Sequence, residues 1–329
     1  MEEAKGLCFM GERSLNMSVI ILLFLFTVSL IGVIKSADIF VDRIVDIGRA
    51  LGISQIILGV TVAAAGTSLP EFGSALISVL TGNPDLGVGV VIGSNIWNIA
   101  GIIGISAILS CAVTTNRDEI RRDGLFGLLS ILILTFFMLM GPVGPLTGVV
   151  LLALYGVYLW VLIKKQRGYY TSHLMDHGEV DAKTIISAIL GFTGLVVFCR
   201  ILVYSAVGIA EIMNVPEMII GLFALAIGTS LAELVVAVNS AMKHMCSLSL
   251  GTVLGSNIFN ILIGIGIPSL FVKIPVEPLS LILDAPVLMG VTVAIMYFMW
   301  TDMELRRVEG VALVAFYLVY AVIRITLTR

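Results

Sequence analysis

Two glutamates, Glu71 and Glu233, lie in the middle of long apolar stretches of this sequence. If those stretches cross a membrane, each carboxylate costs about 2.5–3.5 kcal/mol on insertion scales, so residues of this kind indicate a function. The same hydroxyl pair precedes each glutamate: Thr67 and Ser68 before Glu71, and Thr229 and Ser230 before Glu233. Because the hydroxyls stand four and three residues before the carboxylate, each trio is expected to share one face of a continuous helix.

A second polar pattern, a serine followed four residues later by an asparagine, also occurs twice: Ser94 with Asn98, and Ser256 with Asn260. Together with the two trios it supplies carboxylate, hydroxyl and amide oxygens, and no histidine, cysteine or methionine converges on them. Hard oxygen ligands suit Ca²⁺ and Na⁺ and do not select zinc or copper. Two carboxylates balance one divalent cation, so the sequence predicts a buried cation site.

Backbone carbonyls near the glutamates are further candidate ligands. Pro70 cannot donate a hydrogen bond to the carbonyl of Gly66, so carbonyl oxygens near Ala64 and Gly66 are expected to be free. The second segment has Ala232 in place of the proline, and a helix break there must depend on Gly228 and its hydroxyl neighbours.

These residues belong to an internal repeat. Residues 59–105 and 221–267 align without a gap and share 21 identities in 47 positions, which chance does not produce. Corresponding residues are 162 positions apart in the recurring motifs: AAGTSLPE at 64–71 with AIGTSLAE at 226–233, and VIGSNIWNI at 91–99 with VLGSNIFNI at 253–261. Asn95 and Asn257 point about 100° away from the neighbouring serines on a helix, and we expect them to pack or cap helices.

The composition places nearly the whole chain in a bilayer. Of 329 residues, 59% are hydrophobic and 12% charged, against roughly 25% charged in soluble proteins. This excludes a disordered chain, and a net charge of −3 without a basic block argues against a nucleic-acid partner. The four cysteines are scattered and show neither metal-ligand spacing nor a disulfide pattern.

The apolar runs predict an all-α integral membrane protein with ten transmembrane helices. The expected spans lie near 17–46, 54–79, 86–112, 124–141, 144–164, 184–211, 217–242, 247–272, 280–300 and 309–327. Residues 1–16 form a polar N-terminal segment without signal-peptide features, 17–164 and 184–329 form two five-helix repeats, and 165–183 form a short loop. Because five is odd, the repeats are expected to be inverted relative to each other, as in secondary transporters.

Lysine and arginine positions predict the orientation. With both termini outside, the inside connections hold twelve of these residues and the outside segments five, Arg324 among them. The loop 165–183 is therefore expected to be cytoplasmic, in a protein of the cell membrane. Asp38, Glu211 and Asp284 lie near span ends without clear counterparts in the other repeat, and we expect them to be solvated.

At its two duplicated motifs the sequence resembles the calcium/cation antiporter superfamily, and most closely its prokaryotic sodium/calcium exchangers. The resemblance is carried by GTSLPE at 66–71, GTSLAE at 228–233, GSNIWN at 93–98 and GSNIFN at 255–260, and the ten-span layout extends it over the chain. It implies Na⁺/Ca²⁺ antiport by alternating access, with spans 1 and 6 sliding across the other eight. No cofactor is expected, and the protein is expected to be a transporter that functions as a monomer.

The resemblance also implies a cluster of four cation sites. Ca²⁺ would be held by Glu71, Glu233, Thr67 and Thr229, and Na⁺ by the same glutamates with Ser68, Ser230, Ser94, Ser256 and the carbonyls of Ala64 and Ala226. Asn98 and Asn260 would line the middle of the cluster.

Several alternatives remain open. Proton/calcium exchangers of the superfamily tend to carry Asn-Ala where this chain has Thr-Ser, so the hydroxyls here favour sodium. Potassium-dependent exchangers usually have Asp where this chain has Asn260. Another divalent cation such as Mg²⁺ is a possible substrate, and a cation channel is the alternative from a different class. An intramembrane serine hydrolase is disfavoured because none of the three histidines lies in a recurring motif.

Overall fold

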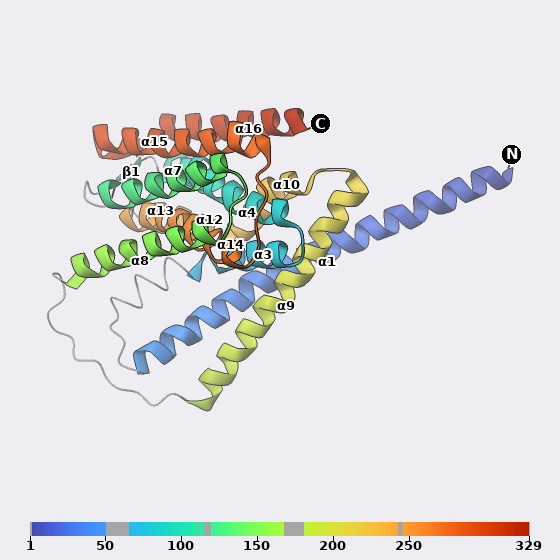
Figure 1. Ribbon diagram of the computed structural model, residues 1–329, viewed down its shortest axis with the longest axis horizontal. Coiled ribbons are helices and arrows are strands. Elements are labelled where there is room, and N and C mark those ends of the chain that lie inside the picture. The colour runs from blue at the N-terminus through green and yellow to red at the C-terminus, as the bar shows by residue number, and fades with distance from the viewer. Residues whose placement is uncertain are drawn as a thin grey trace.

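The computed structural model describes residues 2–50, 66–110, 112–114, 120–167, 181–242 and 246–328. These residues are almost entirely helical (Figure 1), apart from a short antiparallel pair of strands, β1 (Ala112–Thr114) and β2 (Glu304–Arg306). The helices of the first half are α1 (Glu2–Ala50), α3 (Leu69–Leu80), α4 (Pro84–Ile96), α5 (Gly104–Ser110), α7 (Leu125–Met140) and α8 (Pro145–Arg167). Those of the second half are α9 (Ala182–Met213), α10 (Glu217–Ile219), α11 (Ala226–Thr229), α12 (Leu231–Met242), α13 (Cys246–Leu262), α14 (Gly266–Phe271), α15 (Ala285–Asp302) and α16 (Arg307–Thr328). Four π-helical turns complete them: η1 (Trp97–Ile103), η2 (Ile120–Gly124), η3 (Ile220–Leu225) and η4 (Ser280–Asp284).

Most of the expected spans correspond to helices of sufficient length. Among the described residues, eight helical stretches are long and apolar enough to cross a bilayer, and Glu217–Thr229 with Leu231–Val238 forms a ninth if this bent pair is one span. The expected span at 54–79 begins outside the described residues, and its described remainder, α3, has 12 residues. The structure thus supports a multi-pass helical membrane protein, while the count of ten stays a prediction.

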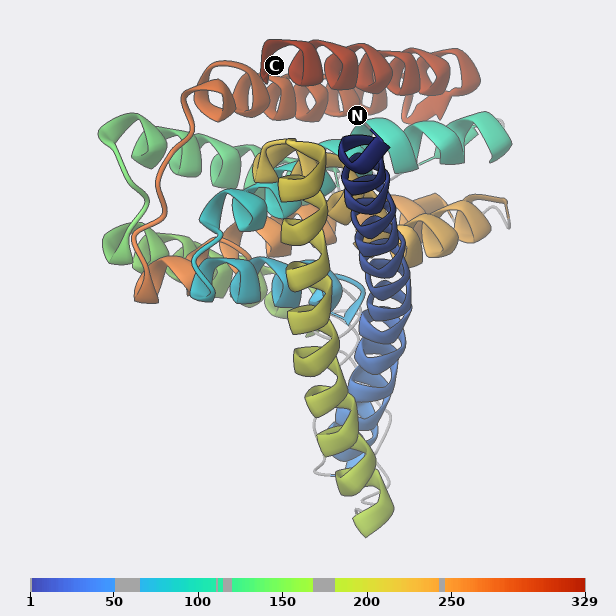
Figure 2. The ribbon, with the colours of Figure 1, turned by 90° about the vertical axis from the view of Figure 1, so that its right-hand side faces the viewer.

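Helices α1 and α9 lie side by side and cross the other helices at a steep angle (Figures 1 and 2). Their close approach requires small side chains, because a Cβ atom on Gly191 of α9 would lie 2.8 Å from the backbone nitrogen of Phe40 in α1. With 49 residues and a rise of 1.5 Å each, α1 is about 70 Å long, far more than the ~30 Å hydrocarbon core. A helix of this length must tilt strongly or extend past the hydrocarbon core.

The stretches that carry the Ser-Asn motifs form the centre of the remaining bundle. In the most apolar window of each span, 89% of the residues of Pro84–Ser110 and 78% of those of Leu250–Phe271 are buried, against 11–33% in the other six. A helix that is apolar all round and buried all round belongs to a core, whereas exposed apolar residues such as Phe24 and Ile282 suit a lipid-facing surface.

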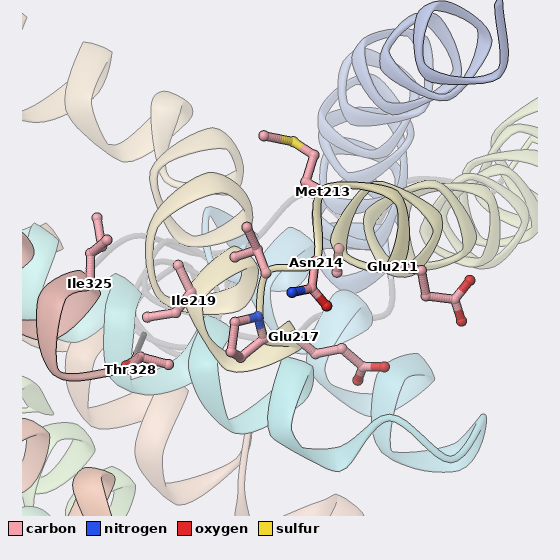
Figure 3. A pocket seen from close by; sticks show the side chains of 10 residues that line it. Glu211, Met213, Asn214, Glu217, Ile219, Ile325 and Thr328 are labelled. Carbon is pink, nitrogen blue, oxygen red and sulfur yellow. The ribbon is translucent and has the colours of Figure 1, made fainter. Parts of the chain in front are cut away.

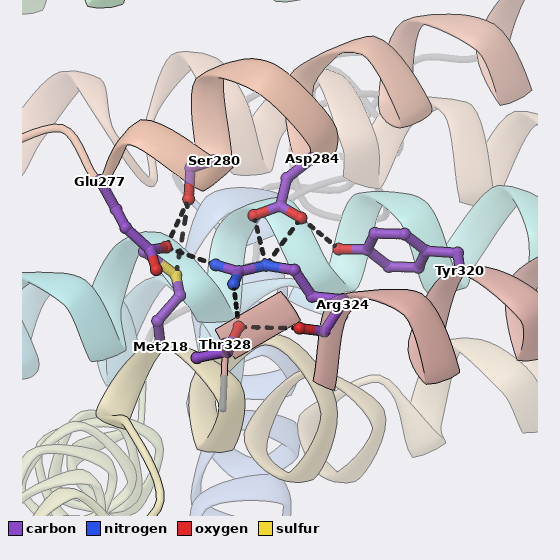
Figure 4. Close-up of polar contacts among 7 residues, drawn as sticks. All are labelled: Met218, Glu277, Ser280, Asp284, Tyr320, Arg324 and Thr328. Carbon is purple, nitrogen blue, oxygen red and sulfur yellow. Dashed lines mark hydrogen bonds and ion pairs between the residues drawn. The ribbon is translucent and has the colours of Figure 1, made fainter. Parts of the chain in front are cut away.

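Two Tyr–Asp–Arg clusters, each with a buried tyrosine and aspartate, lie in the bundle away from the glutamates. The carboxylate of Asp284 accepts hydrogen bonds from the Tyr320 hydroxyl (2.8 Å) and from Nε of Arg324 (3.0 Å), and Arg324 also contacts Glu277 (Figure 4). The Tyr320, Arg324 and Asp284 side chains are at most 3% exposed. Burying a charge costs free energy unless it is paired in this way.

The second cluster nearly repeats the first. Asp123 accepts from the Tyr158 hydroxyl (3.3 Å) and from Nε of Arg122 (2.7 Å). Tyr158 and Tyr320 are 162 residues apart, and Asp123 and Asp284 are 161 apart. The duplication therefore extends beyond the two sequence motifs.

The expectation that Asp284 is solvated and lacks a counterpart is wrong, because its carboxylate is fully buried against a partner 40 residues away. Asp38 and Glu211 are exposed, as expected. The burial of Arg324 also removes it from the charges counted as outside in the expected orientation, where four such residues then remain against the twelve expected inside.

Replacing Arg324 by methionine should lower the free energy of unfolding by about 3–5 kcal/mol, because Asp284 would remain buried without its cation. Arg306→Met is the matched control, since Arg306 is 58% exposed and its ion pair with Glu304 should contribute at most about 1 kcal/mol. Denaturation of the purified variants in mixed detergent micelles measures both losses. Equal losses for the two variants would contradict the importance of the buried cluster.

Candidate ion-binding site

Both glutamates lie directly after a break in a helix. The chain turns at Thr67 and Ser68 before α3 begins, and Glu71 lies in the first turn of α3. It breaks again at Ser230 before α12 begins, and Glu233 lies in the first turn of α12. The first residues of α3 and α12 are 162 positions apart, so the breaks fall at corresponding places.

The two breaks arise from different sequences. In the first, Pro70 lies in the first turn of α3, where a missing backbone N–H does no harm. In the second, Ala232 replaces the proline, yet Ser230 leaves the helical conformation (φ −79°, ψ 14°) and the flanking helices enclose 46°. The break expected near Gly228 is therefore present without a proline.

The hydroxyls beside the breaks bind the glutamate of the other half of the chain. Ser230 Oγ donates to Glu71 Oε1 at 2.8 Å, and Ser68 Oγ donates to Glu233 Oε1 at 3.3 Å. All four residues are fully buried. These reciprocal bonds bring the two glutamates of the sequence repeat into one site.

This pairing differs from the expected one. A continuous helix would place Ser68 beside Glu71, but the chain leaves the helix at Ser68, so its hydroxyl reaches Glu233. The second carboxylate oxygen, Oε2, of each glutamate is buried and has no hydrogen-bond partner within the described part of the chain. Each glutamate therefore keeps one oxygen atom available for a ligand.

Other expected ligands have their hydroxyl protons already engaged in hydrogen bonds. Thr229 Oγ1 donates to the Leu225 carbonyl (2.9 Å), and Ser94 Oγ donates to the Val90 carbonyl (2.6 Å). A hydroxyl that donates its proton still offers lone pairs to a cation. Thr67 Oγ1 and Ser256 Oγ lie 3.4 Å apart and share one hydrogen bond.

The expected ligands also include the backbone carbonyls of Ala64 and Ala226. Ala64 lies outside the described residues. The carbonyl of Ala226 accepts from the backbone nitrogen of Ser230 at 3.2 Å and from Thr229 Oγ1 at 3.4 Å. A carbonyl has two lone pairs, so these bonds already occupy much of its capacity.

The asparagines lie where the two central helices meet. Asn98, in the π-helical turn η1, and Asn260, in α13, are fully buried. Asn95 and Asn257 do not merely fill space: each donates its side-chain amide to the backbone carbonyl of the other. The feature of the sequence that indicates this pairing is their separation by 162 residues, which is the offset of the repeat.

The site combines negative charge with neutral oxygens. Within the described residues neither glutamate forms an ion pair with a lysine or arginine. The described residues also contain no cluster of three or more His, Cys, Asp and Glu side chains arranged around a metal position, so the only acidic ligands at this site are the two glutamates. Two uncompensated carboxylates in a buried site need a cation or a proton to neutralise them. Carboxylates, hydroxyls and amides form the donor set that Ca²⁺ and Na⁺ accept.

A separate pocket lies between the end of α9, α10 and the last turn of α16 (Figure 3). Its volume is about 730 Å³, and its lining includes Glu211, Asn214, Glu217 and Thr328. Asn83 Nδ2 donates to Glu217 Oε1 at 2.8 Å beside it. None of the expected ion ligands lines this pocket.

A multi-pass helical protein with paired, buried carboxylates at two helix breaks has the architecture of a membrane cation transporter. The comparison with known proteins makes this specific. The sequence model of the sodium/calcium exchanger protein family matches residues 21–164 and again 183–326, and the chain belongs to this family. The protein is therefore a transporter of the cation/Ca²⁺ exchanger type and not an enzyme.

Individual relatives agree with the family assignment. The sodium/calcium exchanger MaX1 of Methanosarcina acetivorans is 29% identical, over 89% of this chain and 95% of its own length. The inner membrane protein YrbG of Escherichia coli is 31% identical, over 84% of this chain and 88% of its own length.

 Among solved structures, the sodium-calcium exchanger NCX_Mj soaked with Na⁺ and Sr²⁺ superposes with a TM-score of 0.63 at 28% identity, covering 92% of this chain and 98% of that one.

Proposed function

We propose that the protein is an antiporter that exchanges Na⁺ for Ca²⁺ by alternating access. The observation that carries this proposal is the pair of reciprocal bonds from Ser230 to Glu71 and from Ser68 to Glu233. They leave two carboxylate oxygens free in a site lined by hydroxyls, where one Ca²⁺ would neutralise both glutamates. Relatives named sodium/calcium exchangers support the same function.

Na⁺ is favoured over the proton as the driving ion because of the hydroxyls. A proton needs only a carboxylate, whereas Na⁺ needs several neutral oxygens around it. Ser68, Ser230, Thr67 and Ser256 supply such oxygens beside the glutamates. Because Na⁺ and Ca²⁺ would share Glu71 and Glu233, their binding would be mutually exclusive, which couples the two fluxes.

Alternating access would arise from movement of α1 and α9 across the other helices, where α1 and α9 are the first helices of two inverted five-helix repeats at 17–164 and 184–329. The pair α1–α9 crosses the remaining bundle as a distinct unit (Figure 2). Its contacts with the site helices include Val41 of α1 against Gly66 and Cys199 of α9 against Gly73. Contacts between side chains of this kind can slide, because no ladder of hydrogen bonds has to break.

The expected orientation has both termini outside the cell membrane and the loop 165–183 in the cytoplasm, with the protein acting as a monomer. The excess of twelve inside over four outside lysines and arginines supports it. A cysteine introduced at Ser172, in a background without the four native cysteines, should resist an impermeant thiol reagent added to intact cells. Rapid labelling of that cysteine would reverse the proposed orientation.

The driving ion is tested by ⁴⁵Ca²⁺ uptake into proteoliposomes. Uptake into Na⁺-loaded vesicles should exceed uptake into K⁺-loaded vesicles about tenfold or more. Ser68→Ala combined with Ser230→Ala should weaken Na⁺ binding more than Ca²⁺ binding, since both hydroxyls are lost but both carboxylates remain. K⁺-loaded vesicles with an imposed pH gradient are the comparison. Uptake that follows the pH gradient and ignores Na⁺ would establish a proton/calcium exchanger instead.

A further inference from the structure

Asn95 of α4 and Asn257 of α13 join the two halves of the chain by a symmetric pair of hydrogen bonds. Asn95 Nδ2 donates to the Asn257 carbonyl oxygen at 3.2 Å, and Asn257 Nδ2 donates to the Asn95 carbonyl oxygen at 3.0 Å. The two residues are 162 positions apart and are 0% and 6% exposed. Each side chain therefore has its amide nitrogen fixed and its amide oxygen, Oδ1, left for another partner.

A third bond breaks this symmetry. Asn257 Oδ1 accepts from Asn98 Nδ2 at 3.0 Å. The corresponding bond in the other half would run from Asn260 Nδ2 to Asn95 Oδ1. Both of those atoms are fully buried, and neither has a hydrogen-bond partner among the described residues. The unpaired donor and the unpaired acceptor are thus the two groups that the repeat would join.

This difference determines which end of each amide can meet a cation. An N–H group cannot coordinate a cation, whereas an amide oxygen can. Because Asn257 holds the nitrogen of Asn98, the free end of Asn98 is its oxygen. Asn260 has no such constraint, since both of its amide atoms are unpaired in the described chain.

We propose that Asn257 and Asn95 are positioning residues that alternately turn the amide oxygens of Asn98 and Asn260 toward the transported cations. Asn257 orients Asn98 in the conformation described here, and Asn95 orients Asn260 in the conformation open to the opposite side. The reason is that inverted repeats exchange their conformations when access alternates, so a bond present in one half is replaced by its counterpart in the other. The inference rests on the proposed function.

The test compares Asn95→Ala with Asn257→Ala in proteoliposomes sorted into the two orientations, so that Ca²⁺ uptake reports on one face at a time. Each substitution should raise the KM for Ca²⁺ about tenfold on one face, with a smaller change in kcat, and the two substitutions should affect opposite faces. Ser106→Ala, which alters a buried polar residue outside the site, should leave both KM values unchanged. If the alanine variants fold poorly, Asn95→Ser and Asn257→Ser should show the same dependence on the face.

A purely structural role would not produce this dependence. Equal changes of KM on both faces for both variants, or no change at all, would overturn the proposal while wild-type exchange remained intact. A wild-type protein that exchanges no cations would overturn the proposed function and this inference with it. The two failures are therefore distinguishable from the wild-type measurement alone.

Discussion

Glu71→Gln and Glu233→Gln are each expected to reduce Ca²⁺ exchange about a hundredfold or more, which corresponds to about 2.7 kcal/mol. Glutamine has nearly the shape of glutamate, and its amide oxygen can still accept the bond from Ser230 or Ser68. The substitution removes one of the two charges that are proposed to neutralise a buried divalent cation, and an unbalanced buried charge is costly. The measurement is ⁴⁵Ca²⁺ uptake into Na⁺-loaded proteoliposomes.

The matched control for this prediction is Glu211→Gln. It removes the same charge from an exposed glutamate of α9 that is not among the expected ligands, and exchange should stay near the wild-type rate. Both site variants should elute from a sizing column like the wild type. Full exchange activity in a correctly folded Glu71→Gln or Glu233→Gln variant would show that the glutamates pack helices and do not bind the ion.

A disulfide between α3 and α9 is expected to stop exchange completely. A Cβ atom placed on Gly73 would lie 2.8 Å from Sγ of Cys199, and a disulfide holds each Cβ about 3 Å from the sulfur of its partner. Gly73→Cys, in a background that retains only Cys199, should therefore form a bond between the site helix and the proposed sliding helix. Because α9 could then no longer move past α3, exchange should fall to background and return on reduction.

The control for the crosslink is Gly73→Cys combined with Cys199→Ala, which introduces the same bulk but cannot form the bond. This variant should not respond to oxidant or reductant. The extent of crosslinking is measured by mass spectrometry of peptides from the same vesicles. Unchanged exchange in fully crosslinked protein would contradict sliding of α9 as the transport movement.

Part of the fold follows directly from the sequence because it depends on local properties. Hydropathy over about 20 residues predicts a membrane-spanning helix, and most of the expected spans are present in the described chain. The first helix break likewise follows from Pro70, whose missing N–H interrupts the local ladder. The second break was harder to predict, since Ala232 is compatible with a continuous helix.

The buried ion pairs could not be predicted from local properties of the sequence. Asp284 and Arg324 look like charges near the ends of two apolar helices, and such charges are usually solvated at the membrane surface. Packing of η4 against α16 removes both from water, and the pairing with Tyr320 then offsets the cost of their burial. Nothing in either segment alone indicates that the other supplies its partner.

The sequence by itself determined the chemistry of the candidate site: two carboxylates in apolar segments, duplicated with their hydroxyl and amide neighbours, predict a site for hard cations. Only the tertiary structure decided which groups meet. Ser68 bonds to Glu233, 165 residues away, instead of the neighbouring Glu71, and Asn95 bonds to Asn257, 162 residues away. Residue type and spacing set the cost of burial and the preferred ligand, because these are properties of single side chains and single helices. The partners depend on how two distant segments pack, and helical periodicity carries no information on that once the helix is broken.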